Sequence, residues 1–169
     1  QPDDLKLPLL RTWQLVFTRM GKPNAATRAE LAKRFDPLFP SSDPLANREL
    51  VALLVYLDSP NVVRDTVPLL SVAEDPDVVP ELLGGERLTQ RNEGYGRAVQ
   101  GVRESQPDRQ QIAYAYALRN ATVGWTPELR RAFFGWFPGA SEWRGGASFS
   151  GFIANIREDA LDQVSDSAF

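Results

Sequence analysis

Four carboxylates in the second half of the sequence could supply a general acid and a general base: Glu93, Glu104, Asp108 and Glu142. Their spacing places no two of them together on one helix face above a pocket. Solvated surface carboxylates are the better interpretation, because charged side chains of this kind are mostly exposed. We therefore expect the chain not to be an enzyme.

The sequence contains no histidine and no cysteine among its 169 residues. It therefore offers no histidine base, thiolate nucleophile, disulfide, Cys/His zinc site or haem attachment motif. The glycines of Gly84-Gly85-Glu86 and of Gly94-x-Gly96 lack the strand, turn and helix of a phosphate-binding loop. We expect no cofactor.

A second group of residues suits contact with another protein. Trp143 and Arg144 are of the types most enriched at interface hot spots, and they stand with Glu142 before a pair of glycines. A loop of this composition exposes its side chains. Together with Arg130 and Arg131 it is our predicted docking surface for a neighbouring domain. The alternative is that Trp143 packs internally and seats the last helix.

The tryptophans suggest an alternative function, a carbohydrate-binding module in which exposed rings stack on sugars. These rings are Trp13, Trp125, Trp136 and Trp143. Three of them lie in or beside apolar stripes, a position that favours burial in a core. The stripes therefore make this function an alternative and not the first prediction.

The chain length and the net charge limit the number of domains and the kinds of partner that we expect. A chain of this size predicts a single domain over residues 1–169, with frayed ends at 1–6 and 165–169. Its 19 basic and 22 acidic residues give a net charge of −3, which argues against a nucleic-acid partner. The apolar runs are too short for membrane insertion. The start at Gln1 suggests a mature segment of a larger protein, monomeric in isolation.

The elements that would hold these residues are predicted to be helices. Asp43-Pro44, Ser59-Pro60 and Asp75-Pro76 follow one another at steps of 16 residues, and a capping residue before proline is typical of a helix start. Evenly spaced helix starts suggest stacked helices, and such stacks usually bind other molecules.

Helical periodicity extends along most of the chain, and no strand alternation is convincing. The predicted helix starts are Thr27, with Glu30 in a capping box, Pro76, Pro107, Thr126-Pro127 and Ser148. The predicted stops are Gly21, Gly84-Gly85 and a turn at Pro138-Gly139, and residues 86–105 are predicted to be an irregular insertion. The predicted buried stripes are Leu9, Trp13, Val16, Phe17 and Met20; Leu50, Leu53, Leu54 and Leu57; Ile112, Ala115, Tyr116 and Leu118; Leu129, Ala132, Phe133 and Trp136; and Phe149, Phe152, Ile153 and Ile156.

Two resemblances to known protein families support the helical prediction. The run from Leu53-Leu54 through Leu57-Asp58-Ser59-Pro60 to Val62-Val63-Arg64 resembles the turn and second helix of a HEAT repeat. A wider set resembles the HEAT-type segment of large exported bacterial multidomain proteins that also carry a c-type cytochrome domain. This set includes Asn47-Arg48-Glu49-Leu50, Tyr114-Ala115-Tyr116-Ala117-Leu118-Arg119, Phe134-x-Trp136-Phe137 and Arg144-Gly145-Gly146-x-Ser148-Phe149.

The resemblance implies a periplasmic or extracellular location and a multidomain parent, with any haem outside these residues. We therefore expect an all-α, HEAT/armadillo-like α-solenoid of about seven or eight helices. Its expected role is that of a scaffold or interaction module that binds neighbouring domains or a protein partner. A HEAT-type DNA glycosylase is a further alternative, but it would require a basic groove.

Overall fold

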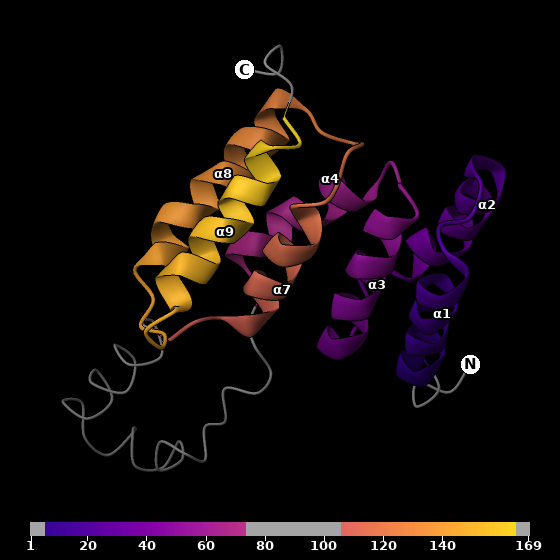
Figure 1. Ribbon diagram of the computed structural model, residues 1–169, viewed down its shortest axis with the longest axis horizontal. Helices are drawn as coiled ribbons and strands as arrows, with labels where there is room; N and C mark the ends of the chain where they lie inside the picture. The colour runs from indigo at the N-terminus through magenta and orange to yellow at the C-terminus, as the bar shows by residue number, and fades with distance from the viewer. Residues whose placement is uncertain (1–5, 74–105, 165–169) are drawn as a thin grey trace.

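The computed structural model describes residues 6–73 and 106–164, and the regular structure in these ranges is entirely helical. Its elements are α1 (Lys6–Met20), α2 (Ala25–Phe35), η2 (Asp36–Leu38), α3 (Pro44–Tyr56), α4 (Val62–Thr66), η3 (Val67–Ser71), α7 (Arg109–Leu118), α8 (Pro127–Ser141) and α9 (Phe149–Leu161). The all-α class is therefore confirmed. Figure 1 shows how these helices are arranged.

Helices far apart in sequence pack as neighbours. α3 contacts α1 on one side and α7 on the other, and α7 also contacts α9. The short segment α4–η3 packs against α3, α7 and α8, while α8 covers α9. The core lies where these elements meet, and it includes Leu50 and Leu54 of α3, Leu118 of α7 and Phe133 of α8. The whole predicted leucine stripe of α3 is buried.

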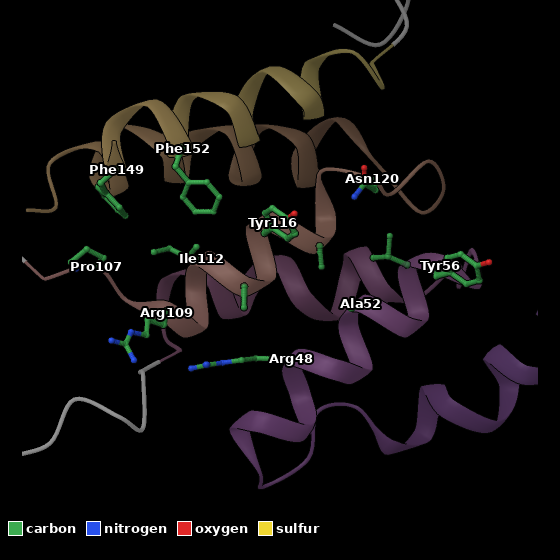
Figure 2. A pocket seen from close by; sticks show the side chains of 13 residues that line it. Arg48, Ala52, Tyr56, Pro107, Arg109, Ile112, Tyr116, Asn120, Phe149 and Phe152 are labelled. Atoms are coloured by element: carbon green, nitrogen blue, oxygen red, sulfur yellow. The ribbon is translucent and has the colours of Figure 1, made fainter. Parts of the chain in front are cut away.

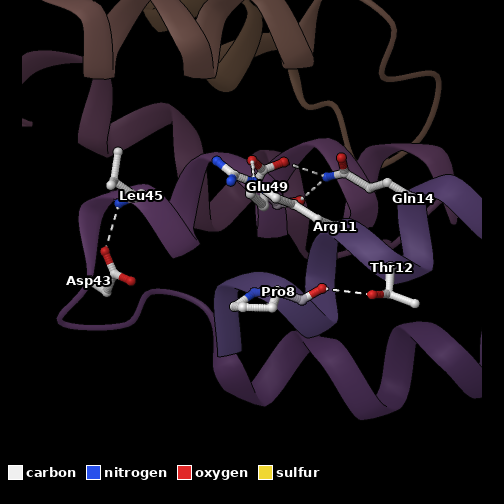
Figure 3. Close-up of polar contacts among 7 residues, drawn as sticks. All are labelled: Pro8, Arg11, Thr12, Gln14, Asp43, Leu45 and Glu49. Carbon is white, nitrogen blue, oxygen red and sulfur yellow. Dashed lines mark hydrogen bonds and ion pairs between the residues drawn. The ribbon is translucent and has the colours of Figure 1, made fainter. Parts of the chain in front are cut away.

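Polar contacts fix α1 against α3 (Figure 3). Gln14 Nε2 donates to Glu49 Oε2 at 2.8 Å, and Arg11 Nε lies 3.2 Å from Glu49 Oε1. A second tie joins the end of α1 and the start of α2 to the turn after α3. There the Asp58 carboxylate lies 2.9 Å from both Lys22 Nζ and Arg28 Nε.

The helix starts follow local capping chemistry at several predicted positions. Asp43 caps α3 by accepting from Leu45 N at 2.9 Å, and Thr126 caps α8 by accepting from Leu129 N at 3.2 Å. The start predicted at Thr27 is wrong, because Asn24 is the N-cap of α2 and accepts from Thr27 N. The start predicted at Pro107 lies slightly early, since Asp108 caps α7.

Ser59-Pro60 does not begin a helix as predicted. α4 starts at Val62 after Asn61, with no side-chain cap hydrogen bond. Ser59 is buried, and its hydroxyl donates to Asp36 Oδ1 at 2.6 Å, so that it links the turn to η2. Ser59 Oγ also accepts from Asn61 N at 3.2 Å, so the local turn bond forms, but the helix begins two residues later than predicted.

The turn predicted at Pro138-Gly139 is also wrong, because α8 continues to Ser141 with Pro138 inside it. Phe137 and Ala140, on either side of these two residues, are buried. Packing of this face keeps the chain helical across the proline.

Several predicted core residues prove to be exposed. The outer face of α1 carries Leu9 and Met20, and Met20 is 82% exposed. Ala132 is exposed on α8, while Tyr116 and Phe152 are exposed on α7 and α9. The buried positions are shifted along each helix and include Leu10 in α1, Tyr114 in α7 and Phe137 in α8. The predicted apolar stripes therefore identify the buried face of these helices only in part.

Some predictions lie outside the described residues. These are the helix start at Asp75-Pro76 with its helix to Leu83, the stop at Gly84-Gly85, the insertion at 86–105, and the chain ends at 1–5 and 165–169. Lys6, predicted to fray, is the first residue of α1. Over the described ranges, none of the helices combines the length and the apolar character needed to cross a membrane.

Candidate functional site

An apolar groove of about 860 Å³ runs along the outer face of α7. Its floor is built by residues that recur every three or four positions, the spacing that brings side chains to one face of a helix. These residues are Arg109, Ile112, Ala113, Tyr116, Ala117 and Asn120. The buried residues Tyr114, Ala115 and Leu118 occupy the opposite face, so α7 has one face in the core and one in the groove.

Two other helices form the walls of the groove, as Figure 2 shows. α3 contributes Arg48, Ala52, Val55 and Tyr56, and the start of α9 contributes Phe149 and Phe152. Pro107 closes the end near the start of α7. Arg48 and Arg109 lie at this same end, whereas Tyr56 and Asn120 lie at the other. The groove therefore has a cationic end and a neutral end.

The aromatic side of the groove is a stacked platform. The rings of Tyr116 and Phe152 are 6.0 Å apart and inclined by 28°, with exposed fractions of 44% and 39%. Arg119 Cζ lies 3.5 Å from the Tyr116 ring centroid, a cation–π contact. Arg119 Nε is also 3.2 Å from Asp159 Oδ2 of α9, an ion pair whose angle is not that of a hydrogen bond. These contacts hold the exposed rings in one orientation.

A buried amide fixes the cationic end. Gln110 is buried between α3 and α7, where its Nε2 donates to Pro44 O at 2.9 Å and to Tyr114 Oη at 2.8 Å. Arg48 Nε donates to Gln110 Oε1, so the guanidinium is held at the groove edge. Burial raises the pKa of Tyr114, outweighing the hydrogen bond from Gln110, and the phenol stays neutral at physiological pH.

A second hollow of about 420 Å³ lies between α1 and α3. It is lined by Gln14, Phe17, Thr18 and Gly21 of the α1 side and by Ala52, Leu53 and Tyr56 of α3. Ala52 and Tyr56 line both hollows. The two concavities are therefore adjacent at α3.

The predicted docking residues lie on α8 and in the loop between α8 and α9, and none of them lines the groove. Trp143 is half-buried, and its ring makes a T-shaped contact with Trp136 at 5.7 Å. Glu142 and Arg144 are exposed beside it. On α8, Arg130 Cζ lies 5.4 Å from the Trp125 ring, while Arg131 is exposed and 3.5 Å from Glu128. The hairpin brings Trp143 into internal packing and leaves its charged neighbours in solvent.

The four tryptophans do not form a row. Trp13 contacts Phe17 and Phe35, and Trp125 contacts Phe133, whereas Trp136 and Trp143 pair with each other. All four are partly buried against the core. The cleft of stacked tryptophans on which the carbohydrate alternative was based is not formed.

The candidate acid–base residues are not brought together in the part of the chain that the structure describes. Asp108 caps α7 by accepting from Gln111 N at 2.8 Å, and Glu142 is exposed at the end of α8. Glu93 and Glu104 lie outside the described residues. Among residues 6–73 and 106–164, no group of three or more acidic side chains is placed to hold a metal ion.

Sequence reasoning missed the groove because its residues resemble core residues. Tyr116 and Phe152 belong to helical apolar stripes, and an apolar face that lines a groove has the same periodicity as one that enters the core. The alanines at 52, 113 and 117 carried no signal at all. One clue was available: α7 is apolar on more than one face, which a helix at the edge of a core does not need.

Comparison of the chain with protein-family models, with curated proteins and with solved structures finds no match.

Proposed function

We propose that this chain is a non-catalytic binding module that docks a segment of another protein, or of a neighbouring domain of its own parent protein, in the groove along α7. The observation that carries the proposal is the exposed, stacked pair of rings Tyr116 and Phe152 in an otherwise largely apolar groove. An exposed apolar concavity of this size is typical of an interaction site. Aromatic side chains held in one orientation lose little conformational entropy on binding.

The arrangement of the helices supports a HEAT-like solenoid as the finer architecture. Arg48, Arg109 and Phe149 lie near the starts of α3, α7 and α9 and at one end of the groove, so these three helices run in the same direction. Parallel helices in a row, backed by others, are the pattern of stacked helical repeats, and stacked repeats form extended concave binding surfaces. The multidomain parent and the export that the family resemblance implies are part of the same proposal.

The composition of the groove favours binding over catalysis. The described residues of its lining combine apolar side chains with two arginines, one asparagine and two tyrosines, and they include no carboxylate. Turnover would require a nucleophile or an oriented base within reach of a substrate. The described lining residues supply an apolar surface and positively charged side chains, and they include no such pair.

The test is a selection of helical and extended peptides from a display library on the immobilised chain, followed by affinity measurements. Tyr116→Ala and Phe152→Ala should each weaken the selected peptides by about tenfold or more, the effect of removing a hot-spot ring. Leu38→Ala is the matched control, because Leu38 is also 44% exposed but lies on η2, outside the groove. The proposal would be wrong if the selected peptides bound Tyr116→Ala and Phe152→Ala as tightly as they bind the control Leu38→Ala. It would also be wrong if the library yielded no binder.

A further inference from the structure

Resting on this proposed function, we infer that the segment bound in the α7 groove is an amphipathic α-helix of a partner protein, with acidic side chains at the end that meets Arg48 and Arg109. Three properties of the groove support this assignment: its length, the state of its backbone groups and the position of its charges.

The length of the groove matches a short helix. Its floor extends from Arg109 to Asn120 along α7, which at 1.5 Å per residue is about 17 Å, or about three helical turns. The walls on α3 and α9 follow the same direction. The alanines at 52, 113 and 117 leave room between the aromatic platform and α3. Apolar side chains at helical spacing on the bound helix would fill these spaces.

The backbone of the groove favours a helix over an extended peptide. All three elements around it are helices, whose interior N–H and C=O groups are paired within the helix. An extended peptide would find no sheet edge there to satisfy its own backbone groups. A helix satisfies them internally and turns its polar face to the open side of the groove.

The charges specify one end of the bound helix. Arg48 and Arg109 lie together at the start of α7, and none of the described residues that line the groove is acidic. Two carboxylates of these elements have contacts of their own: Glu49 contacts Arg11 and Gln14, and Asp108 accepts a hydrogen bond from Gln111 N at the start of α7. Both arginines have contacts within the protein, but their field still extends over about 8 Å at physiological salt. A carboxylate placed at this end would gain a charge-assisted contact.

The experiment uses designed amphipathic peptides of about 18 residues, long enough for measurable helix formation. All carry the same leucine stripe, and they differ only in two residues at one end, which are Glu, Gln or Lys. Each set is made with the variable pair at either terminus, because the groove can accept a helix in both directions. Affinity is measured by fluorescence anisotropy for the wild type, Arg109→Gln and Arg109→Glu, with circular dichroism to confirm that each variant folds.

The wild type should bind the Glu peptide about tenfold more tightly than the Gln peptide at low salt, and high salt should remove the difference. Arg109→Gln should reduce this preference, and Arg109→Glu should reverse it so that the Lys peptide binds best. The salt dependence of the wild type tests the inference even if an Arg109 variant fails to fold.

The inference and the proposed function fail in different ways. If the wild type binds the Glu and Gln peptides with equal affinity, the inference that the bound helix has an acidic end is wrong. If Tyr116→Ala also weakens the binding of both peptides, docking in the groove is still supported. If an extended peptide binds tightly and no helical peptide does, the inference that the bound segment is a helix is wrong. If none of the peptides binds and the library also yields no binder, both proposals are wrong.

Discussion

Gly124 and Gly135 are the same residue type in opposite environments. Gly124, after α7, has a φ of +82°, and a Cβ at this position would lie 2.8 Å from Pro60 O. Gly135 lies inside α8, and a Cβ there would meet nothing within 4 Å. Gly124 thus allows the turn after α7 to approach the turn before α4, whereas Gly135 only adds freedom to the unfolded chain.

We expect Gly124→Ala and Gly135→Ala to change stability in opposite directions. The first should lower the free energy of unfolding by about 1–3 kcal/mol, through a strained φ and a steric clash. The second should raise it by about 0.5–1 kcal/mol, the helix-propensity difference between the two residues. Urea unfolding curves with unchanged slopes would measure both effects. A loss of stability in both variants would mean that α8 is packed more tightly at Gly135 than the structure shows.

Tyr116 and Phe152 show why sequence alone could not identify the site. Their spacing with Ile112 and with Ile156 is helical, and we predicted them to be buried. The structure leaves both rings exposed and stacked on each other. Periodicity measures which residues share a helix face, but what covers that face depends on elements distant in sequence. Sequence periodicity alone therefore cannot distinguish a face that lines an open groove from a face that is buried in a core.

Single helices were predicted well where the signal was local. Gly21, with a φ of +81°, follows the end of α1, and Asp43 and Thr126 cap α3 and α8. In each case the side chain or the backbone freedom acts within a few residues. Ser59 accepts locally from Asn61 N without starting a helix there, and its hydroxyl also donates to Asp36, 23 residues away. Such a contact depends on the tertiary arrangement.

Pro138 is the clearest conflict between local signal and packing at the level of one helix. Proline has no N–H, so the usual hydrogen bond to the carbonyl of Phe134 cannot form. Pro138 is exposed, which places the defect on the solvent side of α8, where water can reach it. Phe133, Phe137 and Ala140 are buried on the opposite side and keep the helix in place.

We therefore expect Pro138→Ala to stabilise the chain, by up to about 3 kcal/mol, because it restores the missing hydrogen bond and removes the ring clash. Thermal unfolding followed by circular dichroism would measure the gain. Ala132→Gly provides a control of helix propensity at an exposed site of the same helix and should lose about 1 kcal/mol. A destabilising Pro138→Ala would show that a bend at Pro138 is needed to seat α8 on η3 and α9.

At the scale of the whole molecule, the groove exists because three helices from distant parts of the chain lie side by side. The floor comes from α7, and the walls come from α3 and α9. The all-α class could be predicted from periodicity, since every described helix carries an apolar face. Which helices become neighbours could not, because α3 and α7 are separated by more than fifty residues of sequence. The site is a property of that arrangement.

The α8–α9 hairpin closes the described part of the chain, and its loop decides between our two hypotheses for Trp143. The ring packs against Trp136, whose Nε1 donates to Gln111 Oε1 of α7 at 2.9 Å. Gly145 lies so close to the Phe149 side chain that a Cβ would overlap it. These contacts connect the loop to the interior and favour a role in seating the hairpin.

Trp143→Ala should therefore lower the free energy of unfolding by about 1–3 kcal/mol, the loss of a half-buried aromatic contact. Arg144→Ala should change it by less than about 0.5 kcal/mol, because Arg144 is exposed. Thermal and urea unfolding of the two single variants would measure the effects. An unchanged melting temperature for Trp143→Ala, combined with weaker association with a neighbouring domain, would instead support docking through this loop. In that case the partner surface would include Glu142, Arg130 and Arg131 as well as the groove.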